Sequence, residues 1–315
     1  MTQHATARDW IFVHVCVVLW GFTAILGKLI TLPALPLVWW RMLLVAALLA
    51  VVPRIWRGLR AMSPRLRWAY AGIGALVAMH WLTFYAAIKL SNASVAATCM
   101  ALGTVFTAVI EPLLTGRRVS LRELGLGVAV LPGVALVAGG VPAGMLAGVA
   151  VGTVSALFVA LFGSLNKRLV EHADPLSVTA LEMGAGAVAL TLLAPLSGLL
   201  WPAFGGDPFV LPSPEDALWL LALAVACTLL PFALFLVALR RMSAFAAQLS
   251  VNLEPVYAIA LAAVLLNEQQ ELTPAFYLGV AIILAVVLAY PLLLRPRRIA
   301  HPELAATGEA KALGE

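Results

Sequence analysis

Arg41, His80, Glu182 and Glu254 are ionisable side chains that lie well inside long apolar runs of the sequence. A charged side chain at the centre of a membrane helix costs about 2.5–3.5 kcal/mol to insert, so such residues usually face a water-filled cavity. There a carboxyl or an imidazole can bind and release a proton, and a guanidinium can bind an anionic group. These four residues are therefore candidates for substrate or proton binding.

Glu254 is the most deeply placed acid, and Asn252 and Pro255 lie beside it. Proline has no N–H to donate and loosens the helix, which leaves backbone carbonyls free to face water. We expect Glu254 to carry proton coupling or a polar contact with the substrate, with His80 as its partner at similar depth. The alternative is that Glu254 hydrogen-bonds a neighbouring helix and serves only assembly.

Aromatic side chains accompany these ionisable groups. Trp20, Trp81 and Tyr85 lie on apolar runs that we expect to border the centre of the protein. We expect them to line a cavity. The alternative for Tyr85, as for Trp39 and Trp40, is the interfacial belt where aromatic rings meet lipid headgroups. The candidate site thus combines charged and aromatic side chains.

The composition indicates a lipid environment for the elements that carry these residues. Of the 315 residues, 63% are hydrophobic and 11% are charged, and the mean hydropathy is +1.01. Soluble domains are about 45–50% apolar and about 25% charged. At about 20 apolar residues per transmembrane helix plus short loops, the length allows roughly ten helices. The sequence therefore predicts an all-α integral membrane protein.

Apolar runs bounded by proline, glycine or basic residues give approximate limits for ten spans. The first run is too long for the apolar core of a signal peptide and is followed by no cleavage motif, so we interpret it as a retained helix. The last fifteen or so residues, from Ala300, are small and polar and are typical of a disordered tail. The predicted spans are 10–30, 37–53, 67–88, 94–114, 121–139, 144–165, 176–198, 216–239, 244–266 and 275–294.

The basic residues predict the orientation of these spans. With the N-terminus inside the cell, every Lys and Arg except Lys28, Arg41 and Lys89 falls on the cytoplasmic side. Loops rich in Lys and Arg remain in the cytoplasm, so we predict an inner-membrane protein with both termini cytoplasmic. In this orientation Arg41 lies near the outer end of its span, where it attracts a carboxylate or snorkels to the interface. Glu182 lies about a third of the way in from the cytoplasm.

The two halves of the sequence resemble each other. The segment Ala86–Ala97 aligns with Val237–Gln248. Five spans per half place the second copy upside down relative to the first, as in inverted repeats. The loop after the fourth predicted span is basic and the loop after the ninth has no basic residue, which agrees with opposite orientations. We predict two five-helix repeats, 10–139 and 144–294, and a cytoplasmic tail, 295–315.

Several short motifs resemble a known family. They are Trp20-Gly-Phe-Thr, Trp40-Arg-Met, and Leu253-Glu-Pro-Val-Tyr followed by Leu278-Gly-Val-Ala-Ile-Ile. Together with ten spans in two halves, they resemble the EamA family of the drug/metabolite transporter (DMT) superfamily over residues 10–294. The resemblance implies a ten-helix bundle with a central cavity between the halves. Members of that family export amino acids and other metabolites, but the matching residues are mostly architectural and do not identify a substrate.

Other classes of function lack their signatures in the sequence. Cys16, Cys99 and Cys227 lie in apolar runs without the spacing of metal ligands. The sequence contains no recognisable nucleotide-binding loop, zinc pair or catalytic triad, and no lysine lies deep in a span as a retinal-type sensor requires. The arginines occur singly or in pairs between apolar runs, which argues against nucleic acid as a partner. A membrane-embedded enzyme or sensor is thus the disfavoured alternative.

The sequence therefore predicts a secondary transporter that exports small metabolites, amino acids foremost, by alternating access through a central cavity. Efflux of hydrophobic cations or drugs is the alternative within transport, because acidic and aromatic residues occur together near the centre. The expected partners are a small-molecule substrate, protons as a coupling ion and the lipid bilayer, with no cofactor or metal. The candidate site residues are Trp20, Arg41, His80, Trp81, Tyr85, Glu182, Asn252 and Glu254.

Overall fold

The computed structural model describes residues 5–116, 118–199, 202–251 and 253–293. Within these ranges the chain is helical and forms no strand, which confirms the predicted all-α fold. The α-helices are α1 (Ala7–Leu29), α2 (Ala34–Ala50), α3 (Pro53–Ala61), α4 (Pro64–Leu90), α5 (Ala93–Cys99), α6 (Leu102–Thr115), α7 (Leu121–Gly139), α8 (Leu146–Leu169), α9 (Pro175–Leu193), α10 (Pro214–Ala224), α11 (Leu230–Leu239), α12 (Ala244–Val251), α13 (Glu254–Leu266) and α14 (Pro274–Leu293). Five shorter segments are η1 (Ala143–Met145), η2 (Val170–His172), η3 (Ala194–Leu199), the π-helical η4 (Val225–Leu229) and η5 (Glu268–Gln270).

Seven helical segments of the described chain are long and apolar enough to cross a membrane, or eight if the bent pair of α2 and α3 is one span. The predicted membrane fold is therefore confirmed, whereas the number of ten spans is not confirmed by this criterion. The difference arises where predicted spans are short or interrupted. Helix α2 has only 17 residues before the chain bends by 95° into α3. Helix α13 and the Pro274–Val286 part of α14 are shorter apolar helices.

Polar side chains fix where several of these helices begin. Thr6, Ser63, Ser120, Asp174 and Ser213 each precede a helix and accept a hydrogen bond from a backbone N–H of its first turn. Such caps satisfy N–H groups that have no partner within the helix, and each stabilises the helix by about 1 kcal/mol. Helix limits in the structure therefore follow short sequence signals that flank the apolar runs.

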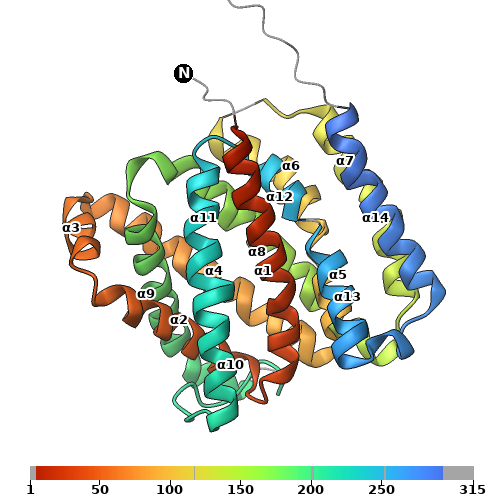
Figure 1. Ribbon diagram of the computed structural model, residues 1–315, viewed down its shortest axis with the longest axis horizontal. Helices are drawn as coiled ribbons and strands as arrows, with labels where there is room; N and C mark the ends of the chain where they lie inside the picture. Colours follow the sequence, from red (N-terminus) through yellow and green to blue (C-terminus); the bar gives the residue numbers. More distant parts are fainter. Residues whose placement is uncertain (1–4, 117, 200–201, 252, 294–315) are drawn as a thin grey trace, which may run out of the picture.

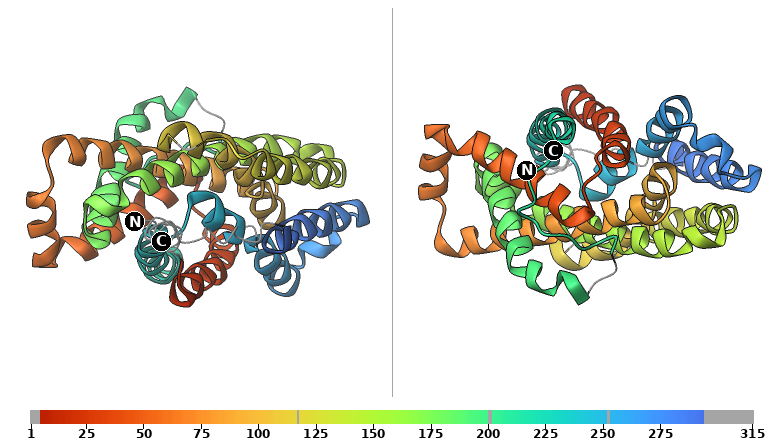
Figure 2. Two further views of the ribbon diagram at one scale, coloured as in Figure 1. Left: turned by 90° about the horizontal axis from the view of Figure 1, so that it is seen from above. Right: turned by 90° about the horizontal axis from the view of Figure 1, so that it is seen from below.

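The helices form one bundle with two distinct edges (Figure 1). Helices α1 and α11 lie side by side, α4 packs against α8 and α9, and α7 pairs along its length with α14. The pair α7–α14 forms one edge, and α2, α3 and α9 lie toward the other, as both views of Figure 2 show. Close approach of α7 and α14 requires glycine, because a Cβ atom at Gly133 would lie 2.7 Å from the carbonyl oxygen of Gly279.

Three of the membrane helices are interrupted. Helix α5 stops at Cys99 and the chain resumes as α6 at Leu102, whereas the sequence predicted one span over 94–114. Helix α12 ends at Val251 and α13 begins at Glu254. Between α10 and α11 the chain widens into the π-helical segment η4. Such interruptions expose backbone groups and are common where a helix borders a binding cavity.

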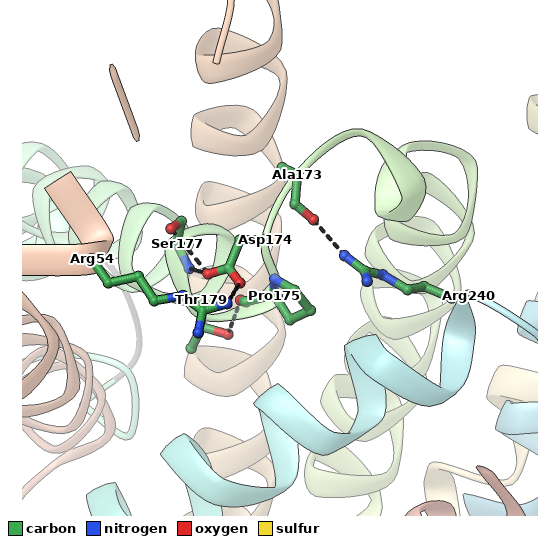
Figure 3. Close-up of polar contacts among 7 residues, drawn as sticks. All are labelled: Arg54, Ala173, Asp174, Pro175, Ser177, Thr179 and Arg240. Atoms are coloured by element: carbon green, nitrogen blue, oxygen red, sulfur yellow. Dashed lines mark hydrogen bonds and ion pairs between the residues drawn. The ribbon is translucent and has the colours of Figure 1, made fainter. Parts of the chain in front are cut away.

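An ion pair and several hydrogen bonds connect neighbouring segments at the turn that precedes α9, at one end of the bundle (Figure 3). Arg54 Nη2 lies 2.9 Å from Asp174 Oδ1, and Asp174 also caps α9 by accepting from Ser177 N at 3.1 Å. Arg240 Nη2 donates to the carbonyl oxygen of Ala173 at 2.8 Å. Basic residues that follow α2 and α11 thus both contact this turn, at the end of the bundle that the basic loops predict to be cytoplasmic.

Candidate functional site

A cavity with a volume of about 70 Å³ lies between helices from both halves of the chain. Pockets for drug-sized ligands usually measure about 300–1,000 Å³, so the cavity in this state fits a small group or a few water molecules. Its walls come from α1, α2, α4, α6, α8, α11, α12 and α13. The lining residues are Trp20, Thr23, Arg41, His80, Trp81, Phe84, Met100, Thr107, Val159, Phe162, Gly163, Phe232, Phe235, Leu239, Ala244, Val251 and Glu254.

Arg41 is held in this wall by three hydrogen bonds. Its Nε donates to Thr228 Oγ1 at 2.6 Å, Nη1 donates to Tyr85 Oη at 2.8 Å, and Nη2 donates to the Cys227 carbonyl at 3.1 Å. All three acceptors are formally neutral, and the side chain of Arg41 is fully buried. A guanidinium has five N–H donors, so these bonds leave one N–H on each terminal nitrogen for a further acceptor.

The π-helical segment supplies two of these acceptors. Pro231 has no N–H, and in a regular helix that N–H would bond to the carbonyl four residues earlier, which is the carbonyl of Cys227. The Cys227 oxygen is therefore free to accept from Arg41. The Thr228 hydroxyl donates its own proton to the Leu223 carbonyl at 2.7 Å, which leaves its oxygen as an acceptor for Nε. A proline in an apolar helix thus creates a binding position for a buried cation.

Aromatic faces complete the surroundings of Arg41. Its guanidinium carbon lies 3.7 Å from the centroid of the Trp81 ring and 5.8 Å from that of Tyr85. A cation over an aromatic face within about 6 Å is stabilised by the quadrupole of the ring, by about 2 kcal/mol or more when desolvated. These contacts compensate part of the cost of burying the charge without using its remaining N–H groups.

Glu254 places an acid in the same cavity. It is the first residue of α13, directly after the break, and only 7% of it is exposed. Its side chain makes no hydrogen bond to another residue within the described ranges. The positive end of the α13 dipole favours a carboxylate at this position. Arg41 and Glu254 line the same cavity, and the two side chains come from different halves of the chain.

His80 is anchored against α8 on another wall of the cavity. The Ser155 hydroxyl donates to the His80 carbonyl at 2.8 Å, and therefore acts as acceptor toward the ring nitrogen Nδ1, also 2.8 Å away. This pairing places the proton of the neutral ring on Nδ1 and leaves Nε2 as an acceptor. The His80 ring also packs against Phe162, with centroids 5.5 Å apart.

Aromatic rings form most of the remaining wall. Trp20 meets Phe235 edge to face with centroids 5.2 Å apart, and Trp81 meets Phe232 in the same way at 6.2 Å. Such pairs fix ring positions because edge-to-face contacts are favoured over parallel sandwiches. The cavity therefore offers a guanidinium, an imidazole, a carboxyl group and an apolar surface.

The structure brings five of the eight predicted site residues together. Trp20, Arg41, His80, Trp81 and Glu254 line the cavity. Tyr85 is fully buried behind it as a partner of Arg41, and Asn252 lies outside the described residues.

The predicted depth of Arg41 requires a correction. The sequence placed Arg41 near the outer end of span 37–53 and offered snorkelling as one reading. Helix α2 begins three residues earlier, at Ala34, and ends at Ala50, so Arg41 lies near its middle with no exposed surface. Its charge is satisfied by protein groups rather than by the membrane interface.

Glu182 lies away from the cavity, on the face of α9 that packs against α4. A Cβ atom at Gly74 of α4 would lie 2.8 Å from the Cα of Glu182, so the two helices nearly touch there. Glu182 is fully buried, and neither carboxyl oxygen has a hydrogen-bond partner in the part of the chain that the structure describes. The structure does not group it with Arg41, which lines the cavity.

Several residues of the site were not predicted from the sequence. Thr23 and Phe232 line the cavity, and Thr228 accepts a hydrogen bond from Arg41 behind it. Threonine is cheap to bury in a helix because its hydroxyl can bond to a preceding carbonyl, so a single threonine in an apolar run carries little signal. The informative signal was Pro231, a proline in mid-span three residues after Thr228. A proline in the middle of a span indicates a backbone carbonyl, four residues earlier, that has lost its helical N–H partner.

The fold and the charged cavity define a helical membrane transporter, and comparisons with known proteins agree. The model of the EamA-like transporter family matches the chain twice, over residues 10–139 and 146–290. The chain therefore belongs to the EamA-like transporter family. A solved crystal structure shares the fold with a TM-score of 0.68 at 18% sequence identity, covering 94% of this chain and 99% of the other. No curated protein sequence gives a significant match.

Proposed function

We propose that this protein is a secondary transporter that exports small zwitterionic metabolites, amino acids foremost, by alternating access through the cavity. One observation carries the proposal: Arg41 and Glu254, with opposite charges, line the same small cavity. A solute with a carboxylate and an ammonium group matches both charges at once. The membership of a transporter family supports the transport role.

The contacts around Arg41 favour a carboxylate as the anionic group. Its free N–H groups lie on the two terminal nitrogens, and a carboxylate accepts two parallel N–H bonds from a guanidinium. Glu254 has no protein hydrogen bond in the described ranges and can accept from an ammonium group. The aromatic walls at Trp81 and Phe232 then receive the apolar part of the solute.

The membrane orientation is part of the proposal. The distribution of Lys and Arg favours the inner membrane with both termini in the cytoplasm. The two repeats are proposed to be 10–139 and 144–294, inverted relative to each other, so that the cavity opens to either side in turn. We propose that a solute or proton gradient drives transport, with Glu254 as the proton-binding group.

A second candidate is efflux of hydrophobic cations. Six aromatic rings and Glu254 in one cavity favour an organic cation, because rings and carboxylate both attract positive charge. Arg41 in the same wall opposes it by like-charge repulsion. The two candidates therefore differ in whether the substrate needs a carboxylate.

Transport by purified protein in proteoliposomes distinguishes these functions. The panel contains amino acids, the corresponding amines that lack the carboxylate, the corresponding N-acetyl derivatives and cationic dyes. We expect counterflow of intact amino acids above that of protein-free liposomes, and at least about tenfold slower movement of both derivatives, because each leaves a buried charge unpaired. Amines or dyes that move as fast as amino acids would favour cation efflux.

A further inference from the structure

Two buried glutamates each hold the start of a broken helix that belongs to the other half of the chain. Glu268, which directly follows α13 and its C-cap, accepts from the backbone N–H groups of Ala93 and Ser94 at 3.0 Å each. It also accepts from the Ser94 hydroxyl at 2.7 Å. These three bonds fasten the N-terminus of α5 to the end of α13.

Glu111 makes the reciprocal contact. It lies in the last turns of α6 and accepts from the N–H groups of Ala244 at 3.0 Å and Phe245 at 2.8 Å. These bonds fasten the N-terminus of α12 to the end of α6. Ala93 and Ala244, the first residues of the two held helices, occupy equivalent positions when the halves of the sequence are aligned.

Both contacts are strong in physical terms. Only 2% of each glutamate is exposed, so water does not compete for its oxygens. Hydrogen bonds from N–H groups to a carboxylate are about twice as strong as bonds between neutral groups. The positive end of a helix adds to the attraction. Each glutamate thus forms a firm connection between the two halves.

The two connections lie at opposite ends of the bundle. Helix α12 begins just after Arg240 and Arg241, at the end where Figure 1 shows it beside the upper part of α6. Helix α5 begins just after α4 ends at Leu90, and Figure 1 shows the lower end of α13, which leads to Glu268, at the other end. One glutamate connection therefore lies at each end of the bundle.

The held half-helices lead directly to the cavity. Helix α5 ends at Cys99, and the next residue, Met100, lines the cavity. Helix α12 contributes Val251 to the cavity wall, and Glu254 begins the next helix. Helix α5 thus has one end at a glutamate connection and leads to the cavity at the other, whereas α12 borders the cavity at both ends, through Ala244 at the Glu111 connection and through Val251.

We propose that Glu111 and Glu268 are the two gate latches of the transporter, each closing one end of the cavity until its half-helix moves. The proposal rests on the proposed alternating-access function and specifies its gates. A solute that shifts Met100 moves α5 against Glu268, and one that shifts Val251 moves α12 against Glu111. Alternating access then requires that one latch opens while the other stays closed.

Single-cysteine accessibility tests the latches without any knowledge of the substrate. The reporter is Thr107→Cys in the cavity wall, in a protein whose Cys16, Cys99 and Cys227 are replaced. Membrane-impermeant thiol reagents are applied from either face of reconstituted vesicles. Glu268→Gln and Glu111→Gln keep the side-chain shape but weaken the acceptor. We expect each variant to raise the labelling rate by about tenfold from one face of the membrane only, because a charge-assisted bond is lost at one end. The two variants should act from opposite faces.

Matched controls come from the same two ends. Glu271→Gln alters a carboxylate that bonds the Asn92 side chain, and Asp174→Asn alters one that pairs with Arg54, and neither should change labelling. If a latch variant does not fold, two milder variants replace it. Ser94→Ala removes one bond to Glu268, and Glu111→Asp shortens the side chain that accepts from α12. Each should raise the labelling rate from the same face as the corresponding Gln variant, but by less. Labelling that stays at the parent rate, or that rises equally from both faces, would overturn the latch proposal.

The result is separable from the proposed function. Face-specific labelling by a protein that moves no amino acid supports the latches and contradicts only the proposed substrate. Amino-acid counterflow in a protein whose latch variants label like the parent contradicts only the latches.

Discussion

The guanidinium carbon of Arg41 lies 3.7 Å from the centroid of the Trp81 ring, on the wall of the central cavity. The ring fixes the plane of the guanidinium, and Tyr85 and Thr228 fix its rotation within that plane. A planar group held in this way is pre-organised for two parallel hydrogen bonds. The geometry of Arg41 should therefore matter for transport as much as its charge does.

Arg41→Lys tests that geometry. Lysine keeps the charge but loses the planar fork, so transport of carboxylate-bearing solutes should fall by about tenfold or more. Transport of neutral solutes should fall less. Initial counterflow rates for both classes in proteoliposomes measure the difference, with the exposed Arg57→Lys as the control. An equal loss for both classes would assign Arg41 a folding role instead.

Pro231→Ala tests the origin of the Arg41 position. Alanine supplies the missing N–H, which can bond to the Cys227 carbonyl and compete with Arg41 Nη2. We expect carboxylate-bearing solutes to bind about tenfold more weakly, since one bond to a charged group is weakened, while the melting temperature stays the same or rises. Pro214→Ala is the matched control, because Pro214 occupies the first turn of α10, where no intrahelical N–H bond is needed. Unchanged binding in Pro231→Ala would show that the π-helical segment does not depend on the proline.

The inverted topology makes a separate prediction. Gln270→Cys and Ser120→Cys place reporters after α13 and before α7, in a background without native cysteines. In right-side-out vesicles an impermeant thiol reagent should label position 270, and it should label position 120 only after permeabilisation. Labelling of both positions from one face contradicts the inverted repeats.

The charged residues of the cavity were predictable from the sequence. Burial of a charge costs free energy, so a charged residue in an apolar run indicates a cavity or a partner. Arg41, His80 and Glu254 are conspicuous in apolar runs, and all three line the cavity. Glu182 shows the limit of that reasoning, since the same rule selected it and the structure buries it elsewhere. Apolar residues such as Phe232 carry no comparable signal, because the same residue types face lipid, core and cavity.

The helix interruptions were only partly predictable. Pro255 indicated a loosened helix near Glu254, and α12 does end at Val251. The break between α5 and α6 at Met100 and Ala101 contains no proline or glycine, so local sequence gave no reason to expect it. Nor could local sequence reveal the long-range contact by which Glu268, from the other half of the chain, holds the N-terminus of α5.

The role of Glu254 gives the most decisive prediction. Glu254→Gln keeps the shape of the side chain and most of its hydrogen-bonding capacity but removes its ability to titrate. If Glu254 binds the coupling proton, the variant should fold and reach the membrane normally, while transport falls and its dependence on pH becomes flat. The dependence of the transport rate on pH is measured by counterflow and by gradient-driven transport. The measurements run from pH 5 to 9, about two units on either side of neutrality. Glu215→Gln, an exposed carboxyl at the start of α10, is the control and should retain the parent profile. A Glu254→Gln protein with the parent rate and pH profile contradicts the coupling role, whereas one that fails to accumulate supports assembly as the function of Glu254.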